Sequence, residues 1–150
     1  MALDKFKIQK TAQNLIGHFD PGAKLAVEMT EDSCNIHVET EMSGLLIGRH
    51  GETLEALQHL LRLLIAKEQA TFVPLILDIG GYRAARQQEL EELAKNLAEK
   101  VKNFGGKEIM PVMSAYERRL VHLILQDIDG VESESEGEEP HRRIVIRPKK

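Results

Sequence analysis

Two glycines bracket a basic pair at residues 48–51, where the sequence reads GRHG inside a stretch otherwise typical of helix. Glycine costs about 1 kcal/mol relative to alanine in a helix interior, so two glycines three positions apart indicate a break between two helices. Backbone N–H groups and the side chains of Arg49 and His50 can bind phosphate from such a break. Ile47 would line the adjoining groove. For these four residues alone, a helix corner with merely solvated charges is the alternative.

A second candidate lies in AYERRLVHLILQ, where Arg118, His122 and Gln126 recur at helical spacing with Arg119 beside them. Most other positions are apolar, which predicts a helix buried nearly all round that keeps one polar stripe. Arg118 offers a fork of donors for phosphate, and His122 can stack on a base or donate a hydrogen bond. The structural alternative is that Arg118 pairs with an acid of residues 132–139 while His122 is a partly buried, satisfied histidine.

The sequence has no motif typical of nucleotide binding, of a disulfide or multi-cysteine metal site, or of catalysis. Neither GxxxxGK[ST] nor GxGxxG is present, which excludes a nucleoside-triphosphate P-loop and a dinucleotide-binding turn. The single cysteine, Cys34, excludes an internal disulfide and a multi-cysteine metal site. An acid or base role for His122 needs a nucleophile or carboxylate partner, and no motif supplies one. We therefore expect no catalytic residue, no metal and no cofactor.

The composition predicts a folded chain. It has 150 residues, 42% of them hydrophobic and 29% charged, enough for one ordinary domain or two small ones. The net charge of −4 argues against a non-specific nucleic-acid binder. A local basic patch can still bind phosphate, because the relevant field acts within about 8–10 Å. No apolar run approaches the roughly 20 residues of a membrane span, and no secretory signal is visible. We expect a cytoplasmic protein without membrane insertion.

The elements that must position the glycine break are predicted in the order helix, strand, strand, helix, helix, strand. Apolar spacing predicts a helix over residues 4–18, and alternation predicts strands in KLAVEMT and CNIHVET. A short helix over Ser43–Ile47 precedes the break, a second follows from about Glu52 to Ala70, and VPLILDIG is a strand. The buried stripe of the second helix is expected to be Leu54, Leu57, Leu61 and Leu64.

Beyond Gly80-Gly81 the order is helix, strand, helix, strand, strand. A long polar helix is expected over Tyr82–Asn103, followed by a short strand in KEIMPV. Ser114 and Glu117 fit a capping box that opens a helix ending near Asp127. VESESEG and RRIVIRP are the last two strands. The acidic run VESESEGEE is expected to be a solvated hairpin, or alternatively to shield the basic strand when no ligand is bound. Along the long helix, the packing stripe is predicted to be Leu90, Leu93, Leu97, Val101 and Phe104.

The fold class is α+β, with domains at residues 1–80 and 81–150. Over its full length, the first domain resembles the prokaryotic-type (type II) KH domain, αββααβ, and IGRHGETLEALQ is the specific part. KH domains clamp about four single-stranded nucleotides with a GxxG loop. An aromatic content of 4% fits a KH domain better than an RRM or OB-fold, which need stacking rings. The resemblance implies that Gly48, Arg49, His50 and Gly51 form the clamp. It also implies that Ile47 lines the adjoining groove.

MSAYERRLVHLILQ followed by SEGEEPHRRIVIRP is similar to the R-three-H (RxxxH) domain, αβαββ, over about residues 81–148. That domain is associated with single-stranded nucleic acid. The resemblance implies that Arg118 and His122 are the signature pair. It implies Arg142 and Arg143 on the final strand as supporting contacts, with Arg119 beside the pair.

A KH domain followed directly by this module resembles the bacterial Jag-type (SpoIIIJ-associated) RNA-binding proteins, here without the small N-terminal domain usual in that family. The resemblance implies single-stranded RNA as the ligand, with single-stranded DNA a further candidate, held at two linked sites. It also implies a homodimer or a complex with a second small KH protein. The alternatives are a protein-interaction adaptor with vestigial nucleic-acid binding, which would dock its partner on Tyr82–Asn103 and the acidic run, and an enzyme that uses His122.

Overall fold

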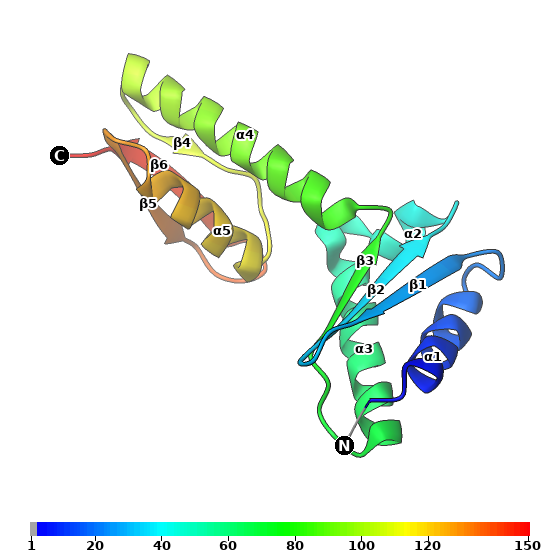
Figure 1. The fold of residues 1–150 in the computed structure, drawn as a ribbon. Coiled ribbons are helices and arrows are strands. Elements are labelled where there is room, and N and C mark those ends of the chain that lie inside the picture. Colours follow the sequence, from blue (N-terminus) through cyan, green and yellow to red (C-terminus); the bar gives the residue numbers. More distant parts are fainter. Residues whose placement is uncertain (1–2) are drawn as a thin grey trace. The chain divides into compact units, whose positions relative to one another are not determined.

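The computed structural model describes residues 3–150, which fold as two compact units, one ending at Arg83 and one beginning at Ala84. The ribbon in Figure 1 shows each unit as a small sheet with helices packed on it. Within residues 3–150, no helix is both long and apolar enough to cross a bilayer.

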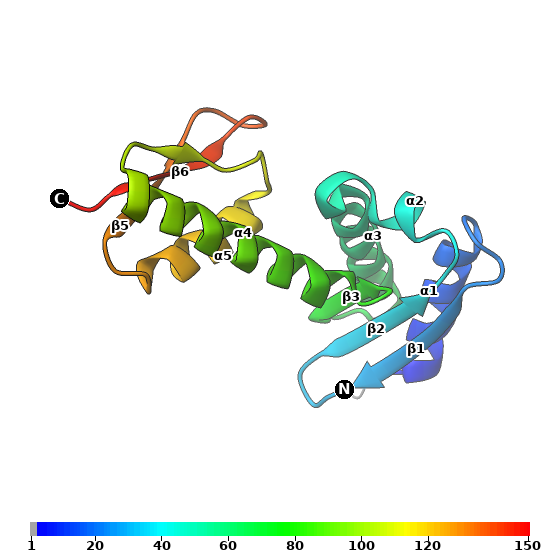
Figure 2. The same ribbon diagram turned by 90° about the horizontal axis from the view of Figure 1, so that it is seen from above.

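The first unit has the predicted αββααβ order. Its elements are α1 (Lys5–Gly17), β1 (Lys24–Met29), β2 (Cys34–Glu39), α2 (Ser43–Ile47), the 3-10 turn η1 (Arg49–Gly51), α3 (Glu52–Gln69) and β3 (Leu75–Ile79). The sheet order is β1-β2-β3, with β1 antiparallel and β3 parallel to the central β2. α1 and α3 cover one face of this sheet (Figures 1 and 2). Because the sheet order is β1-β2-β3, β3 is an edge strand, and it lies beside α3.

The core of the first unit lies between that face of the sheet and the two helices. α3 buries Leu54, Leu57, Leu61 and Ile65. The sequence-based stripe was wrong in its last member, since Leu64 is exposed and Ile65 is buried in its place. Because an α-helix has 3.6 residues per turn, the residue four positions after Leu61 lies closer to the helix face of Leu61 than the residue three positions after it. Ile65 is therefore directed into the core in place of Leu64.

The second unit has the predicted order αβαββ. Its elements are α4 (Tyr82–Phe104), β4 (Glu108–Ile109), α5 (Ala115–Gln126), β5 (Val131–Glu136) and β6 (Arg143–Pro148). The sheet is antiparallel in the order β4-β6-β5, so β6 is central. Ile144 and Ile146 of β6 point into the core, and by strand alternation Arg143 and Arg147 lie on the opposite face. The first two residues of α4 belong to the first unit.

α4 packs through a different stripe from the one expected. It buries Leu90, Ala94, Ala98 and Val101, while Leu93 and Leu97 are partly buried at its margin. Phe104, the last residue of the helix, is 83% exposed instead of completing the stripe. Small alanines allow close packing against the helix, a contact that the apolar pattern of larger residues does not reveal.

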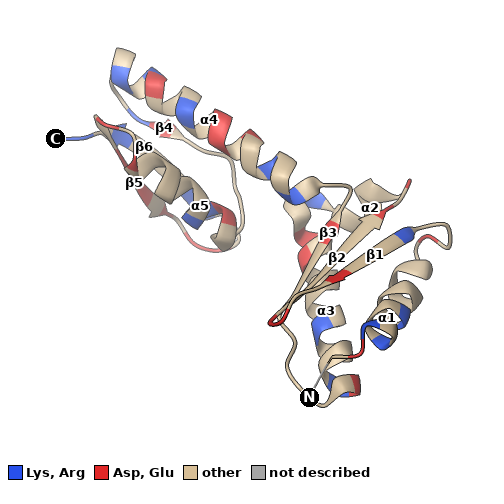
Figure 3. Ribbon diagram, in the orientation of Figure 1, with Lys and Arg blue, Asp and Glu red and all other residues tan. Residues whose placement is uncertain are grey.

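The hairpin of β5 and β6 sets an acidic strand against a basic one, as Figure 3 shows along β5 and its turn. Arg147 forms ion pairs with Glu136 at 2.7 Å and with Glu134 at 3.4 Å. The hydrogen bond to Glu136, together with the charges of Glu136, Glu134 and Glu132, raises the pKa of Arg147 above its ordinary value. The acidic run thus engages part of the basic strand within the unit.

Candidate nucleic-acid interface

The loop between α2 and α3 has a backbone that only glycine adopts easily at two places. Gly48 has φ 72° and ψ −172°, and Gly51 has φ 80° and ψ 13°. A Cβ atom on Gly48 would lie 2.1 Å from Oγ1 of Thr53, and one on Gly51 would lie 3.0 Å from Cε1 of Tyr82. His50 between them is also left-handed, at φ 56°. Both glycines are therefore required by conformation and by close approach.

This loop presents Arg49 to solvent. The Arg49 side chain is exposed and makes no hydrogen bond or ion pair with the part of the chain that the structure describes. His50 is half-buried. Ile47 packs partly against the core, while Leu45, which the sequence did not single out, is 55% exposed at α2. A cation without a partner thus stands at the start of α3, where the helix dipole adds positive potential.

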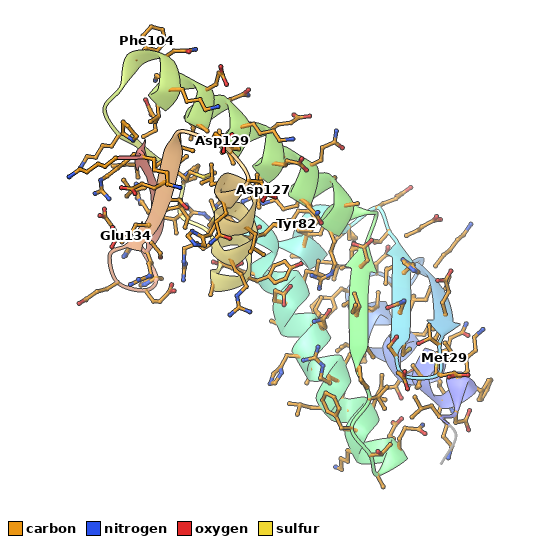
Figure 4. The ribbon with its side chains drawn as sticks, turned by 60° about the vertical axis from the view of Figure 1, so that its left-hand side comes forward. Met29, Tyr82, Phe104, Asp127, Asp129 and Glu134 are labelled. Carbon is orange, nitrogen blue, oxygen red and sulfur yellow. The ribbon has the colours of Figure 1, made fainter. Side chains whose placement is uncertain are left out.

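Tyr82 and Arg83 support the loop from beyond the predicted domain boundary. The ring of Tyr82, the first residue of α4 (labelled in Figure 4), packs against Gly51. Arg83 donates from Nη1 to Glu55 Oε1 at 3.0 Å, and its backbone N–H donates to Asp78 Oδ1 at 3.2 Å. These contacts assign both residues to the first unit. Sequence reasoning missed them because they follow the Gly80-Gly81 turn and have no local motif.

The free edge of β3 is covered by side chains. Arg62 donates to the carbonyl of Leu75 at 3.2 Å, and the amide oxygen of Gln58 accepts from Leu77 N–H at 2.9 Å. Arg83 donates to the carbonyl of Leu77 at 2.8 Å. The edge polar groups beside α3 are therefore already satisfied, which protects the edge against pairing with another strand.

In the second unit, Arg118 is only 7% exposed. Its Nη1 donates to the carbonyl of Met113 at 2.6 Å, and its Nη2 donates to the carboxylate of Glu139. The contact with Glu139 is the one that the structural alternative predicted, namely pairing with an acid of the 132–139 run, whereas the bond to the Met113 carbonyl was not predicted. The guanidinium group of Arg118 is committed within the unit.

His122 is also held by neighbours. Its Nδ1 lies 2.7 Å from Ser133 Oγ and its Nε2 lies 3.1 Å from Gln126 Nε2. With the proton on Nδ1, His122 donates to Ser133 and accepts from Gln126, so one neutral tautomer satisfies both contacts. The half-buried ring is thus fixed between α5 and β5.

An open groove of about 590 Å³ runs between α5 and the hairpin. Arg142 holds its far wall, because its Nε donates to Ser135 Oγ at 2.7 Å and its Nη1 to the carbonyl of Gly137 at 2.7 Å. Arg119 lines the groove and has no hydrogen bond or ion pair with residues 3–150. The complete lining is Ala115, Arg118, Arg119, His122, Ser133, Glu134, Ser135, Arg142 and Ile144.

The structure therefore brings together four of the five residues predicted in the second unit. Arg118, Arg119, His122 and Arg142 line one groove, whereas Arg143 does not line it and lies on the opposite face of β6. Within residues 3–150, no group of three or more His, Cys, Asp and Glu side chains could hold a metal ion. Burial raises the pKa of the Cys34 thiol, which disfavours the reactive thiolate.

Comparison with known proteins gives a match in each unit. The family model described as "KhpA/KhpB, KH domain" matches residues 5–76, and the model of the R-three-H domain matches residues 88–148. Three similar proteins are each named RNA-binding protein KhpB. The one from Clostridium symbiosum is 39% identical over 81% of this chain and 54% of its own length. That from Lactiplantibacillus plantarum is 34% identical over 85% and 40%, and that from Bacillus subtilis is 28% identical over 97% and 69%. The chain spans about half the length of the first of these and less of the second.

Proposed function

Because the chain is KhpB-like, with a KH domain of the KhpA/KhpB type followed by an R-three-H domain, we propose that it binds single-stranded RNA without catalysing a reaction. The observation that carries this proposal is Arg49, an exposed arginine without a partner in the described chain, on a loop whose two glycines cannot be replaced without strain. Such a loop accepts an extended sugar–phosphate backbone and has little other use for an uncompensated cation.

In the KH unit, the loop Gly48–Gly51 clamps the backbone of a short segment. Arg49 binds phosphate, His50 adds a hydrogen-bond donor, and Ile47 with the exposed Leu45 forms an apolar wall for bases. The positive end of the α3 dipole contributes further attraction to the phosphates.

In the R-three-H unit, the groove beside α5 holds a second segment. Arg119, His122 and Arg142 face it, and Arg118 shapes its floor while it remains bonded to Met113 and Glu139. Arg143, outside the groove, contributes only long-range attraction. Two modest sites on one chain raise the apparent affinity through effective concentration when one RNA reaches both. Single-stranded DNA offers the same phosphates and is the natural competitor to test.

A partner KH domain is also proposed, from a second copy of the chain or from a small KH protein. The supporting observation is an exposed apolar stripe on α3, in which Leu60, Leu63 and Leu64 recur at helical spacing. This stripe is also what would favour a protein-interaction adaptor. Light scattering of wild type and Leu63→Asp tests it: a dimer lost in the variant supports the partner face, and equal monomer masses for both count against self-association.

Fluorescence anisotropy with a short labelled single-stranded RNA at two salt concentrations tests RNA binding. Arg49→Asp/His50→Asp is expected to weaken binding more than tenfold and to flatten the salt dependence, because fewer phosphates are neutralised. Lys7→Asp/Lys10→Gln on the exposed side of α1 changes the net charge by the same amount, with His50 counted as neutral, and is the matched control, which is expected to bind nearly as wild type. Arg119→Ala/His122→Ala, which leaves the contacts of Arg118 with Met113 and Glu139 in place, measures the share of the R-three-H unit. Equal binding by the loop variant and the control would leave a KH fold without a KH clamp.

A further inference from the structure

Tyr116 is an aromatic side chain on α5 that no described contact explains. Its side chain is 68% exposed, and its hydroxyl has no hydrogen-bond partner within residues 3–150. Burying an aromatic ring in a core stabilises a fold, but a ring left in water at the first turn of a helix does not. The residue therefore has a surface available for a ligand.

Tyr116 lies beside the groove on the same helix. The groove is lined by Ala115 and Arg119, which are the residue before Tyr116 and the residue one turn after it. At about 100° per residue, Tyr116 and Arg119 are about 60° apart around the helix, so their side chains are neighbours at the rim. A flat ring and a guanidinium group without a partner thus stand next to each other at one end of the groove.

We propose that Tyr116 and Arg119 form a one-nucleotide site at the rim of the groove, in which the Tyr116 ring stacks on a base and Arg119 binds the adjoining phosphate. This rests on the proposed RNA-binding function and deepens it. Arg118, although it begins the RxxxH motif, is then a positioning residue that holds the end of α5 against the hairpin and does not bind phosphate itself.

The existing hydrogen bonds of Arg118 and Arg119 indicate which of the two arginines binds phosphate. Turning Arg118 toward a phosphate would strip a hydrogen bond from the buried carbonyl of Met113 and a charge partner from Glu139. Arg119 has no such bond to lose and lines the same groove. A phosphate therefore meets the lower energetic cost at Arg119, with the stacking ring one helical turn away.

Substitutions at Tyr116 test the stacking step. Stacking of one base on an aromatic side chain is worth about 5-fold to 140-fold in affinity. Tyr116→Ala should therefore weaken binding of a short single-stranded RNA at least about 5-fold, while Tyr116→Phe, which keeps the ring, stays within about twofold. Phe104→Ala is the matched control, because Phe104 is the other exposed aromatic residue of residues 84–150 and lies at the C-terminal end of α4 (Figure 4). It should bind as wild type.

A spectroscopic readout separates stacking from a change in folding. The chain contains no tryptophan, so Tyr116→Trp and, as a control, Phe104→Trp each introduce a single indole. Its emission, excited where RNA barely absorbs, should be quenched by RNA in the Tyr116→Trp variant and unchanged in the Phe104→Trp variant.

Arg119→Gln tests the phosphate step. It should reduce the slope of log affinity against log salt by about 0.7, the value for one phosphate on a single strand, without changing the midpoint of unfolding. Lys107→Gln, an exposed lysine outside the groove, is the charge-matched control.

The outcomes separate this site from the wider function. If wild type binds RNA and the Gly48–Gly51 loop variant loses it, while Tyr116→Ala binds as wild type and Tyr116→Trp is not quenched, the stacking site is wrong and RNA binding stands. If wild type binds no single-stranded RNA, the proposed function fails and this site fails with it.

Discussion

Arg49 and Arg118 are the motif arginines of the two units, and the structure treats them in opposite ways. Arg49 is exposed and has no partner in the described chain, whereas Arg118 is buried and bonded to Met113 and Glu139. An arginine at a motif position can thus serve the ligand in one domain and the fold in the other. Substitutions at Gly48, Arg118 and Glu139 test whether the roles of the two arginines differ in this way.

The largest effect is expected from Gly48→Ala in the KH loop. The backbone of Gly48 lies in a region nearly restricted to glycine, and a Cβ would meet Oγ1 of Thr53 at 2.1 Å. Strain and overlap together predict a loss of about 3 kcal/mol in the free energy of unfolding, measured by urea denaturation. Gly44→Ala is the matched control, because its Cβ meets nothing within 4 Å and its position is helical. It should be neutral or slightly stabilising.

An equal, small effect for both glycine variants would show that the loop adapts, and the clamp geometry would then not depend on its glycines. A large loss confined to Gly48→Ala would support a rigid loop. In that case the exposure of Arg49 is a built feature, because the same backbone that requires Gly48 presents the arginine.

The next effect separates Arg118 from its neighbour. Arg118→Ala removes hydrogen bonds of a charged group to a buried carbonyl and to a carboxylate, so it should lower the free energy of unfolding by about 2 kcal/mol. Arg119→Ala, an exposed substitution one residue away, should change it by less than about 0.5 kcal/mol. Urea unfolding followed by circular dichroism measures both. If the two variants unfold at the same urea concentration, Arg118 is not a structural residue and the contrast with Arg49 disappears.

The sequence correctly predicted those structural features that depend on residues close together in the chain. The helix Ser43–Ile47, the glycine break after it and the Ser114 cap follow from residue types within a few positions, and the structure contains all three. In each case the controlling contacts lie within one turn of chain, so periodicity and capping rules are sufficient.

The parts that the sequence left open depend on distant contacts. Arg118 is committed through Glu139, far along the chain on the hairpin turn, so its motif alone left two interpretations open. Glu117 supplies only half of the expected capping box: its N–H donates to Ser114 Oγ, but its carboxylate is bonded to Arg86 at 2.8 Å. Tyr82 supports Gly51 from beyond a diglycine turn that looked like a boundary. Tertiary partners decided each of these outcomes.

The smallest effect concerns Glu139, whose side chain is 61% exposed although it bonds to the buried Arg118. Glu139→Gln keeps the size and an acceptor while it removes the charge, so the loss of unfolding free energy should stay below about 1 kcal/mol. If the acidic run shields the cations of the second unit, the same change should tighten single-stranded RNA binding about twofold to fivefold, measured by anisotropy at low salt.

Glu138→Gln is the control: it removes an equal charge from the same turn and leaves the Arg118–Glu139 ion pair in place. Comparing RNA affinity in the two variants shows the cause of any tightening. Tighter binding in the Glu139 variant alone assigns the shielding to the Arg118–Glu139 contact, and Arg118 would then approach Arg49 in role once the acid is gone. Equal tightening in both variants assigns it to general charge around the groove. No tightening in either leaves the acidic run as a solvated hairpin and keeps the two arginines apart, because Arg118 would then stay on Met113 and Glu139 whether or not RNA is present.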